Sequence, residues 1–232
     1  MNLEIIPILC NEKNMANYAY LIKSPASNQV IIVDAAETKP ILKVLEEQKL
    51  TPTHILTTHH HYDHVGANTD LKQKYGLNII APKKEFSQIP GADMPVSDNE
   101  KIEINNIIFQ VLEAPGHTNG HVLYYIPKEN LLFTGDVLFN LCVGGLFEGG
   151  PDEMFTSLQK IKLLPDETLI LPGHEYTHAG ISQRLLQEPA FQPYLKKFLE
   201  RQQGMFSPST LKEEKTFNPY LQIQTLTEFL GQ

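Results

Sequence analysis

Four histidines and an aspartate fall within six consecutive residues, 59 to 64, of a chain that has nine histidines in all. The segment reads His-x-His-x-Asp-His, with the ligand-type residues at His59, His61, Asp63 and His64. Imidazole nitrogens and carboxylate oxygens are the groups with which proteins hold zinc and similar divalent ions. Alternate residues of an extended chain project to the same side, so the first two histidines face one point and the Asp-His pair turns towards a second. The spacing therefore predicts ligands for two metal ions.

Three more ligand-type residues stand in glycine turns that follow β-rich runs. His117 lies in APGHTNGH, Asp136 in FTGD and His174 in LPGHEY. Glycine lets the backbone turn sharply, so the next side chain can point into a shared site and complete the ligand sets. Asp34, at the end of QVIIVDA, and His121 are candidate hydrogen-bond partners of a metal-binding histidine. The other histidines are interpreted as ordinary buried or exposed residues: His54, His60 and His178.

Short strand-like runs alternate with helical segments through the first two thirds of the chain, and these elements must position the ligands. NYAYLI, QVIIVDA and NIIFQVLEA are rich in β-branched and aromatic residues and are bounded by Asn, Gly and Pro. Helical spacing predicts helices over 38–50, 67–76 and 151–164. Strand signals stop after residue 178. We therefore expect an α/β catalytic domain over residues 1–178 and a helical substrate-recognition region over 179–232.

The composition is that of a globular protein, with 41% hydrophobic and 20% charged residues. A formal net charge of -8 and the lack of a basic stripe disfavour a nucleic-acid partner. No apolar run reaches the roughly 18 residues of a membrane helix, and LEIIPILC lacks the basic flank of a signal peptide. Cys10 and Cys142 are expected to be reduced. We expect a cytoplasmic monomer with neither a membrane nor a nucleic-acid partner.

The segments THHHYDH, PGHTNGH, FTGD and PGHEYT together resemble the metallo-β-lactamase superfamily, and within it glyoxalase II, the hydroxyacylglutathione hydrolases. GGPDEMFTSL and the tail SPSTLKEEKTFNPYL resemble glyoxalase II as well. The resemblance covers most of the chain and implies an αββα sandwich with a small C-terminal helical region. It implies two divalent metal ions, zinc with iron or manganese as alternatives. The implied ligands are His59, His61 and His117 for one metal, Asp63, His64 and His174 for the other, and Asp136 as the bridge.

The activity that this resemblance implies is hydrolysis of glutathione thioesters, such as S-lactoylglutathione to lactate and glutathione in methylglyoxal detoxification. The expected nucleophile is a hydroxide bridging the two metals. Asp63 is expected to orient this hydroxide, and Asp136 to keep the metals at bridging distance. A thiolate, the anion of a thiol with a pKa of about 8.5, leaves without a dedicated general acid.

The substrate-binding positions match the family only in part. Glyoxalase II holds glutathione with a lysine and a tyrosine in the loop aligned with CVGGLFEGG, with a tyrosine after the last histidine ligand, and with basic residues near the C-terminus. Tyr176 matches, whereas the lysine position is Gly145 and the loop tyrosine is Phe147. No basic pair stands in TEFLGQ. Lys212 and Lys215 are candidate replacements for these cations.

Three alternatives stay open at this point. The first is a thioesterase that acts on a thioester of another thiol, because expected glutathione contacts are absent. The second is a persulfide dioxygenase, a relative with the same histidine loop and a single iron, which the full second ligand set and the helical tail disfavour. The third is a metal-holding scaffold without turnover, which has no need of an open hydroxide site.

Overall fold

Two six-stranded β-sheets form the centre of the fold in the computed structural model, which describes residues 3–25, 27–177, 192, 196, 200 and 208–231. The first sheet has the order β1 (Glu4–Cys10), β2 (Asn17–Lys23), β3 (Gln29–Val33), β4 (Thr51–Leu56), β5 (Asn78–Pro82) and β6 (Met94–Val96). The second has the order β14 (Ser209–Thr210), β13 (Leu169–Pro172), β10 (Leu131–Gly135), β9 (Val122–Ile126), β8 (Ile107–Glu113) and β7 (Lys101–Ile104). A separate hairpin pairs β11 (Leu138–Phe139) with β12 (Cys142–Val143).

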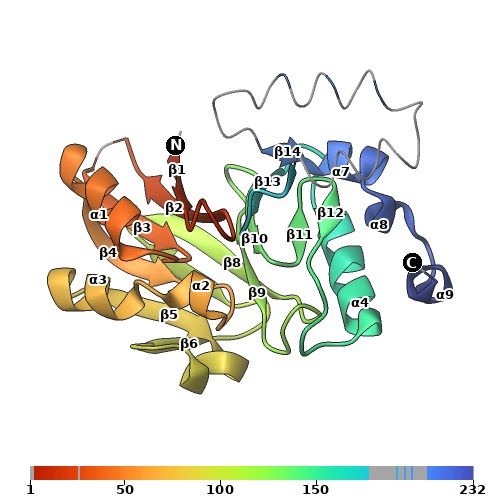
Figure 1. Cartoon of the computed structure of the whole chain (residues 1–232), viewed down its shortest axis with the longest axis horizontal. Coiled ribbons are helices and arrows are strands. Elements are labelled where there is room, and N and C mark those ends of the chain that lie inside the picture. The colour runs from red at the N-terminus through yellow and green to blue at the C-terminus, as the bar shows by residue number, and fades with distance from the viewer. Residues whose placement is uncertain are drawn as a thin grey trace.

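Helices cover the outer faces of the two sheets. Figure 1 shows α1 (Thr38–Glu47) and α3 (Asn68–Tyr75) beside the first sheet, and α4 (Pro151–Lys162) beside the second. The shorter helices are α2 (Tyr62–Val65), the 3-10 helix η1 (Lys83–Gln88), α7 (Leu211–Phe217), α8 (Pro219–Gln222) and α9 (Leu226–Leu230). The resulting layers are those of the expected αββα sandwich, so the predicted fold class is confirmed.

Side-chain alternation along the strands builds three cores. In β2, Tyr20 and Ile22 enter the core between the sheets, whereas Ala19 and Leu21 enter the core beneath α1 and α3. Successive residues of a strand point to opposite faces, and both faces of this sheet are covered, so β2 is buried almost throughout. The predicted helices over 38–50, 67–76 and 151–164 correspond to α1, α3 and α4.

The tail contributes a strand that the sequence pattern did not predict. Ser209 and Thr210 form β14, which pairs antiparallel with β13 at the edge of the second sheet. Helices α7 to α9 follow within the region expected to be mainly helical, whereas the helices that the sequence predicts over 181–188 and 191–203 lie almost wholly outside the described residues. Most of the 178–207 stretch, His178 included, lies outside the described residues, so the division at residue 178 stays a prediction. Within the described ranges, no helix has the length and apolar character needed to span a membrane.

Candidate metal centre

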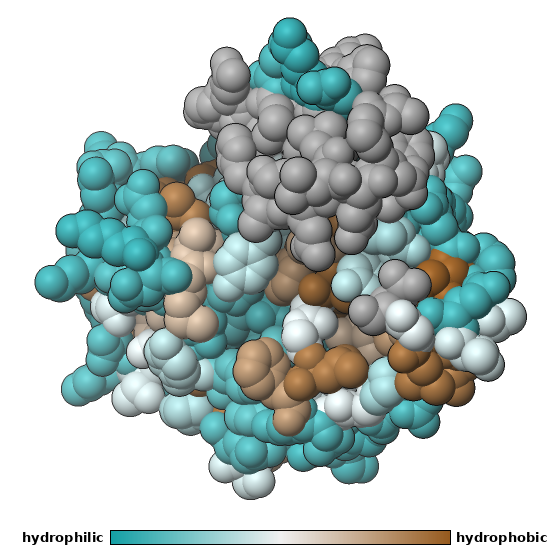
Figure 2. All heavy atoms as spheres, turned by 45° about the vertical axis from the view of Figure 1, so that its right-hand side comes forward, coloured by the Kyte–Doolittle hydropathy of each residue, from teal (hydrophilic) through white to brown (hydrophobic). Residues whose placement is uncertain are grey.

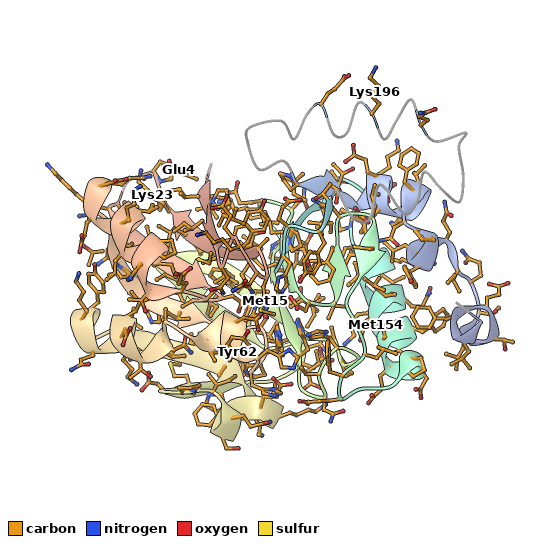
Figure 3. All side chains as sticks on the ribbon, in the orientation of Figure 1. Glu4, Met15, Lys23, Tyr62, Met154 and Lys196 are labelled. Carbon is orange, nitrogen blue, oxygen red and sulfur yellow. The ribbon has the colours of Figure 1, made fainter. Side chains whose placement is uncertain are left out.

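Strand ends from both sheets meet at one edge of the sandwich. β3 and β4 are parallel, so Asp34, which follows β3, lies near the histidine loop that follows β4. β10 and β13 are also parallel, which brings Asp136 close to His174. The loop between β8 and β9 adds His117. Met15 and Tyr62, labelled in Figure 3, flank this edge where the two halves of the molecule meet.

The first cluster consists of His59, His61 and His117. One ring nitrogen from each lies within 4.8 Å of the others. The Nδ1 of His117 donates to the Gly145 carbonyl at 2.7 Å, so its Nε2 presents a lone pair, and this atom is 3.0 Å from the Nδ1 of His61. His59 is fully buried, and its Nε2 has no hydrogen-bond partner among the described residues. Three ring nitrogens therefore converge, and that of His59 is left without a hydrogen-bond partner in the described structure.

The second cluster consists of Asp63, His64 and His174, whose ligand atoms also lie within 4.8 Å of one another. The Nδ1 of His174 donates to the Met15 carbonyl at 2.7 Å, which leaves its Nε2 to face the cluster. That atom is 3.2 Å from the Nε2 of His64 and 3.5 Å from Oδ2 of Asp63. All three residues are buried.

Asp136 reaches both clusters with a single carboxylate. Its Oδ2 lies 3.4 Å from the Nε2 of His117 in the first cluster and 3.1 Å from the Nε2 of His174 in the second. Its Oδ1 is 3.3 Å from the Nε2 of His64. The preceding Gly135 has a φ of +47°, and a Cβ there would lie 2.6 Å from the Nε2 of His121. Glycine is therefore required for Asp136 to enter the site.

The protonation states of His59 and Asp136 suit cation binding. Burial, together with the neighbouring His64 and His121, lowers the pKa of His59 well below its ordinary value, so the ring is neutral. Burial alone would raise the pKa of Asp136, but His64 and His174 hold it well below its ordinary value, so the carboxylate is charged. Neutral imidazoles and ionised carboxylates are the forms that bind metals.

These residues fit two divalent cations. The orphaned His59 nitrogen, the two close pairs of imidazole nitrogens and the shared Asp136 carboxylate are each satisfied by a positive ion. Three histidines on one side, and two histidines with an aspartate on the other, are donor sets typical of zinc and iron. The structure brings together all seven residues that the sequence singled out, and their roles as ligands remain a prediction.

Asp34 and His121 contact the centre from behind. The Oδ2 of Asp34 lies 3.0 Å from the Nδ1 of His64, and the same carboxylate accepts from the amide and hydroxyl of Thr58. His121 was expected to be a hydrogen-bond donor behind the ligands. Instead its Nε2 accepts the backbone N–H of Asp136 at 3.1 Å, and its ring stacks on His59 with centroids 4.8 Å apart.

Replacing Asp34 with asparagine is expected to weaken metal binding about 10- to 100-fold, the usual cost of losing such a partner. The reason is that the amide fixes the orientation and basicity of the His64 imidazole less well than the carboxylate does. Asparagine tolerates the φ of +54° at this position. Competition against a chromophoric chelator measures the affinity, with the exposed Asp70→Asn as the matched control. An affinity equal to that of the wild type would contradict the expected role of Asp34.

Glu85 is a buried residue that sequence reasoning missed. Its carboxylate accepts hydrogen bonds from the amide and Nδ1 of His60, at 2.8 and 2.9 Å, and from Thr118 and the Gly120 amide. It therefore joins the two loops that carry the first cluster. The Nε2 of His60 lies 3.1 Å from Glu148, which extends the contacts to a third loop. Within KKEF, nothing in the sequence distinguishes this glutamate from an exposed one.

The expected substrate-binding residues line the rim. Phe147 is 72% exposed, and its ring centroid lies 5.6 Å from that of His61 and 5.2 Å from that of His117. A Cβ at Gly145 would lie 3.2 Å from the Phe147 ring, so the absence of a side chain at 145 leaves room for this ring. The Tyr176 ring stacks on that of His174 at 4.8 Å. Hydrophobic side chains also reach the surface on the α4 side of the molecule (Figure 2), the side on which the 144–149 loop leads into that helix.

The candidate replacement cations differ in their surroundings. Lys215 is paired with Asp166 at 2.6 Å, whereas Lys212 is exposed on α7. Because Lys215 is already paired with Asp166, it is the less suitable contact for a substrate carboxylate.

Comparison with known proteins gives consistent results. Residues 14–174 match the metallo-beta-lactamase superfamily. The chain is 44% identical over 215 residues to a hydroxyacylglutathione hydrolase of Photobacterium profundum, covering 90% of this chain and 83% of that protein. It is 42% identical over 224 residues to a hydroxyacylglutathione hydrolase of Rhizobium meliloti, covering 94% and 86%. The crystal structure of TTHA1623 in a di-iron-bound form superposes with a TM-score of 0.68 at 26% identity, covering 93% of this chain and 100% of that chain. The stretch that matches the superfamily includes both clusters and Asp136.

Proposed function

The chain belongs to the metallo-β-lactamase superfamily and, within it, to the hydroxyacylglutathione hydrolases, and from this premise we propose that it hydrolyses S-lactoylglutathione and related glutathione thioesters at a two-metal site. The observation that carries the proposal is the Asp136 carboxylate, which lies within 3.4 Å of both histidine clusters. A charged, buried carboxylate in that place suits a pair of cations better than a single one.

The proposed ligands are those that the geometry groups together: His59, His61 and His117 for one ion, Asp63, His64 and His174 for the other, and Asp136 for both. When bound, two such ions lower the pKa of water from about 15.7 to near 7 and polarise a carbonyl oxygen. Asp63 would then orient the attacking water, and Asp136, which lies beside both clusters, would hold the two ions together. No side chain needs to protonate the leaving group, because a thiolate is stable near neutral pH.

The identity of the metals is a finer part of the proposal. The mixture of imidazole and carboxylate suits zinc, iron or manganese. The di-iron-bound form of TTHA1623, whose fold this chain shares, supports a site that accepts iron. Substrate contacts are proposed for Tyr176, Phe147 and the Gly145 backbone, because they stand at the rim beside the clusters.

Metal content and a thioester panel, measured on one preparation, test this function. We expect close to two metal ions per chain and hydrolysis of S-lactoylglutathione faster than that of acyl thioesters of other thiols. A rate no better than buffer for the glutathione ester would contradict the substrate assignment. Oxygen uptake with glutathione persulfide and one iron per chain would instead support the dioxygenase alternative.

A further inference from the structure

Asn17 is a buried residue that contacts every member of the second cluster. It is the first residue of β2 and is fully inaccessible to solvent. Its Nδ2 lies 2.9 Å from Oδ2 of Asp63, 3.5 Å from the Nε2 of His64 and 3.4 Å from the Nε2 of His174. Within the described chain, no hydrogen bond joins it to a histidine of the first cluster. The amide therefore distinguishes the two metal positions.

The backbone around Asn17 is fixed to the turn that carries His174. Asn17 and His174 form an isolated antiparallel bridge, and the Tyr18 amide donates to the Gly173 carbonyl at 2.8 Å. The side chain is held too, because Asn11 donates from its Nδ2 to Oδ1 of Asn17 at 3.1 Å. With its oxygen engaged by Asn11, the amide of Asn17 turns its NH₂ group towards the cluster.

The NH₂ group is a donor and offers no lone pair to a cation. Its effect on a metal must therefore act through the ligands. Among the described residues, Asn17 supplies the one hydrogen bond made to the Asp63 carboxylate. Asp63 lies in the first turn of the four-residue α2, and this bond holds its Oδ2 beside the Nε2 atoms of His174 and His64, at 3.5 and 3.8 Å. A ligand held in place before binding loses less freedom when the ion arrives.

We propose that Asn17 is a positioning residue that sets how tightly the second cluster retains a divalent cation, by holding Asp63 against His64 and His174. The inference rests on the proposed two-metal function. The proposed effect is confined to the second metal position, because in the described structure Asn17 makes no hydrogen bond to a histidine of the first cluster.

Calorimetric titration of chelator-stripped protein with Zn²⁺ tests the inference. The wild type is expected to bind in two steps, and Asp63→Ala, which removes a ligand-type residue of the second cluster, identifies the step that belongs to that cluster, called the second step below whatever the order of filling. Asn17→Ala should leave the first dissociation constant unchanged and raise the second about 10-fold or more, the scale on which such supporting contacts act. Asn11→Gly removes the hydrogen bond that anchors Asn17 and tolerates the φ of +48° at residue 11. It should raise the second constant by a smaller factor, and it serves if Asn17→Ala does not fold. Asn14→Ala, an exposed asparagine in the same loop, is the matched control and should change neither step.

The outcomes separate the two levels of the argument. A wild type that binds a single ion, or none, contradicts the two-metal function before any variant is compared. A two-step wild type with an unchanged second step in both Asn17→Ala and Asn11→Gly overturns the inference alone. Equal weakening of both steps together with a lower melting temperature also overturns it, because that result describes general loosening of the fold. So does a control variant that weakens the second step as much as Asn17→Ala.

Discussion

Replacing Asp136 with asparagine is expected to lower kcat/KM for S-lactoylglutathione by on the order of 10³-fold, since the lost charge stabilisation amounts to several kcal/mol and each 1.36 kcal/mol is tenfold. The substitution keeps the shape of the side chain and removes the negative charge that lies within 3.4 Å of both clusters. It also removes the carboxylate that, against the effect of burial, raises the pKa of His64 well above its ordinary value.

The measurement pairs steady-state kinetics with metal analysis. Asp136→Asn should hold less metal than the wild type. Asp166→Asn is the matched control, because Asp166 is exposed and paired only with Lys215 in the described structure. An Asp136→Asn enzyme with two retained ions and a normal rate would remove the basis of the proposed mechanism.

A second large effect concerns pH and stability. Glu214 on α7 is fully buried; its carboxylate accepts from the Leu141 amide and from Asn218. Burial raises the pKa of this carboxyl group from 4.5 to about 7. Between these two values the folded protein holds a proton that the unfolded chain has lost. The stability that this proton contributes is therefore fully present below pH 4.5 and is lost as pH rises through about 7, a change of about 3 kcal/mol at 1.36 kcal/mol per pKa unit.

Urea unfolding of the metal-free protein between about pH 5 and 8 measures this contribution. Other groups titrate in the same range, so the informative quantity is the difference between the wild type and Glu214→Gln. That difference should move in favour of the glutamine variant as pH rises, because glutamine has no charge to bury. Glu47→Gln, on the exposed side of α1, should run parallel to the wild type. Parallel curves for Glu214→Gln as well would show that the buried carboxyl group does not govern the pH dependence.

The fold was predictable because its signals are local. The buried runs of β2 and β3 and the helical spacing of α1 and α4 each lie within a dozen consecutive residues. β14 escaped prediction, because two residues make it and its partner strand lies about forty positions earlier in the chain. Such a short strand has no periodicity to detect.

Some polar residues with a role in this structure were likewise predictable from the sequence, and others were not. His117, Asp136 and His174 follow glycine at the ends of strand-like runs, so their grouping was expected from the sequence. Asn17 and Glu214 gave no such signal. Asn17 is 46 positions from Asp63, and Glu214 is 73 positions from Leu141. Polar residues of this kind acquire their roles only through tertiary contacts, which a single sequence does not report.

The Glu85 carboxylate bears on how this enzyme can be recombined with its relatives. Because one side chain accepts from both His60 and the 118–120 turn, those two loops share an anchor that lies between them in the chain. A chimera in which residue 85 is no longer an acid loses this shared anchor, even when every ligand-type residue is retained. Loop grafting in this scaffold therefore has to move the three segments as one block.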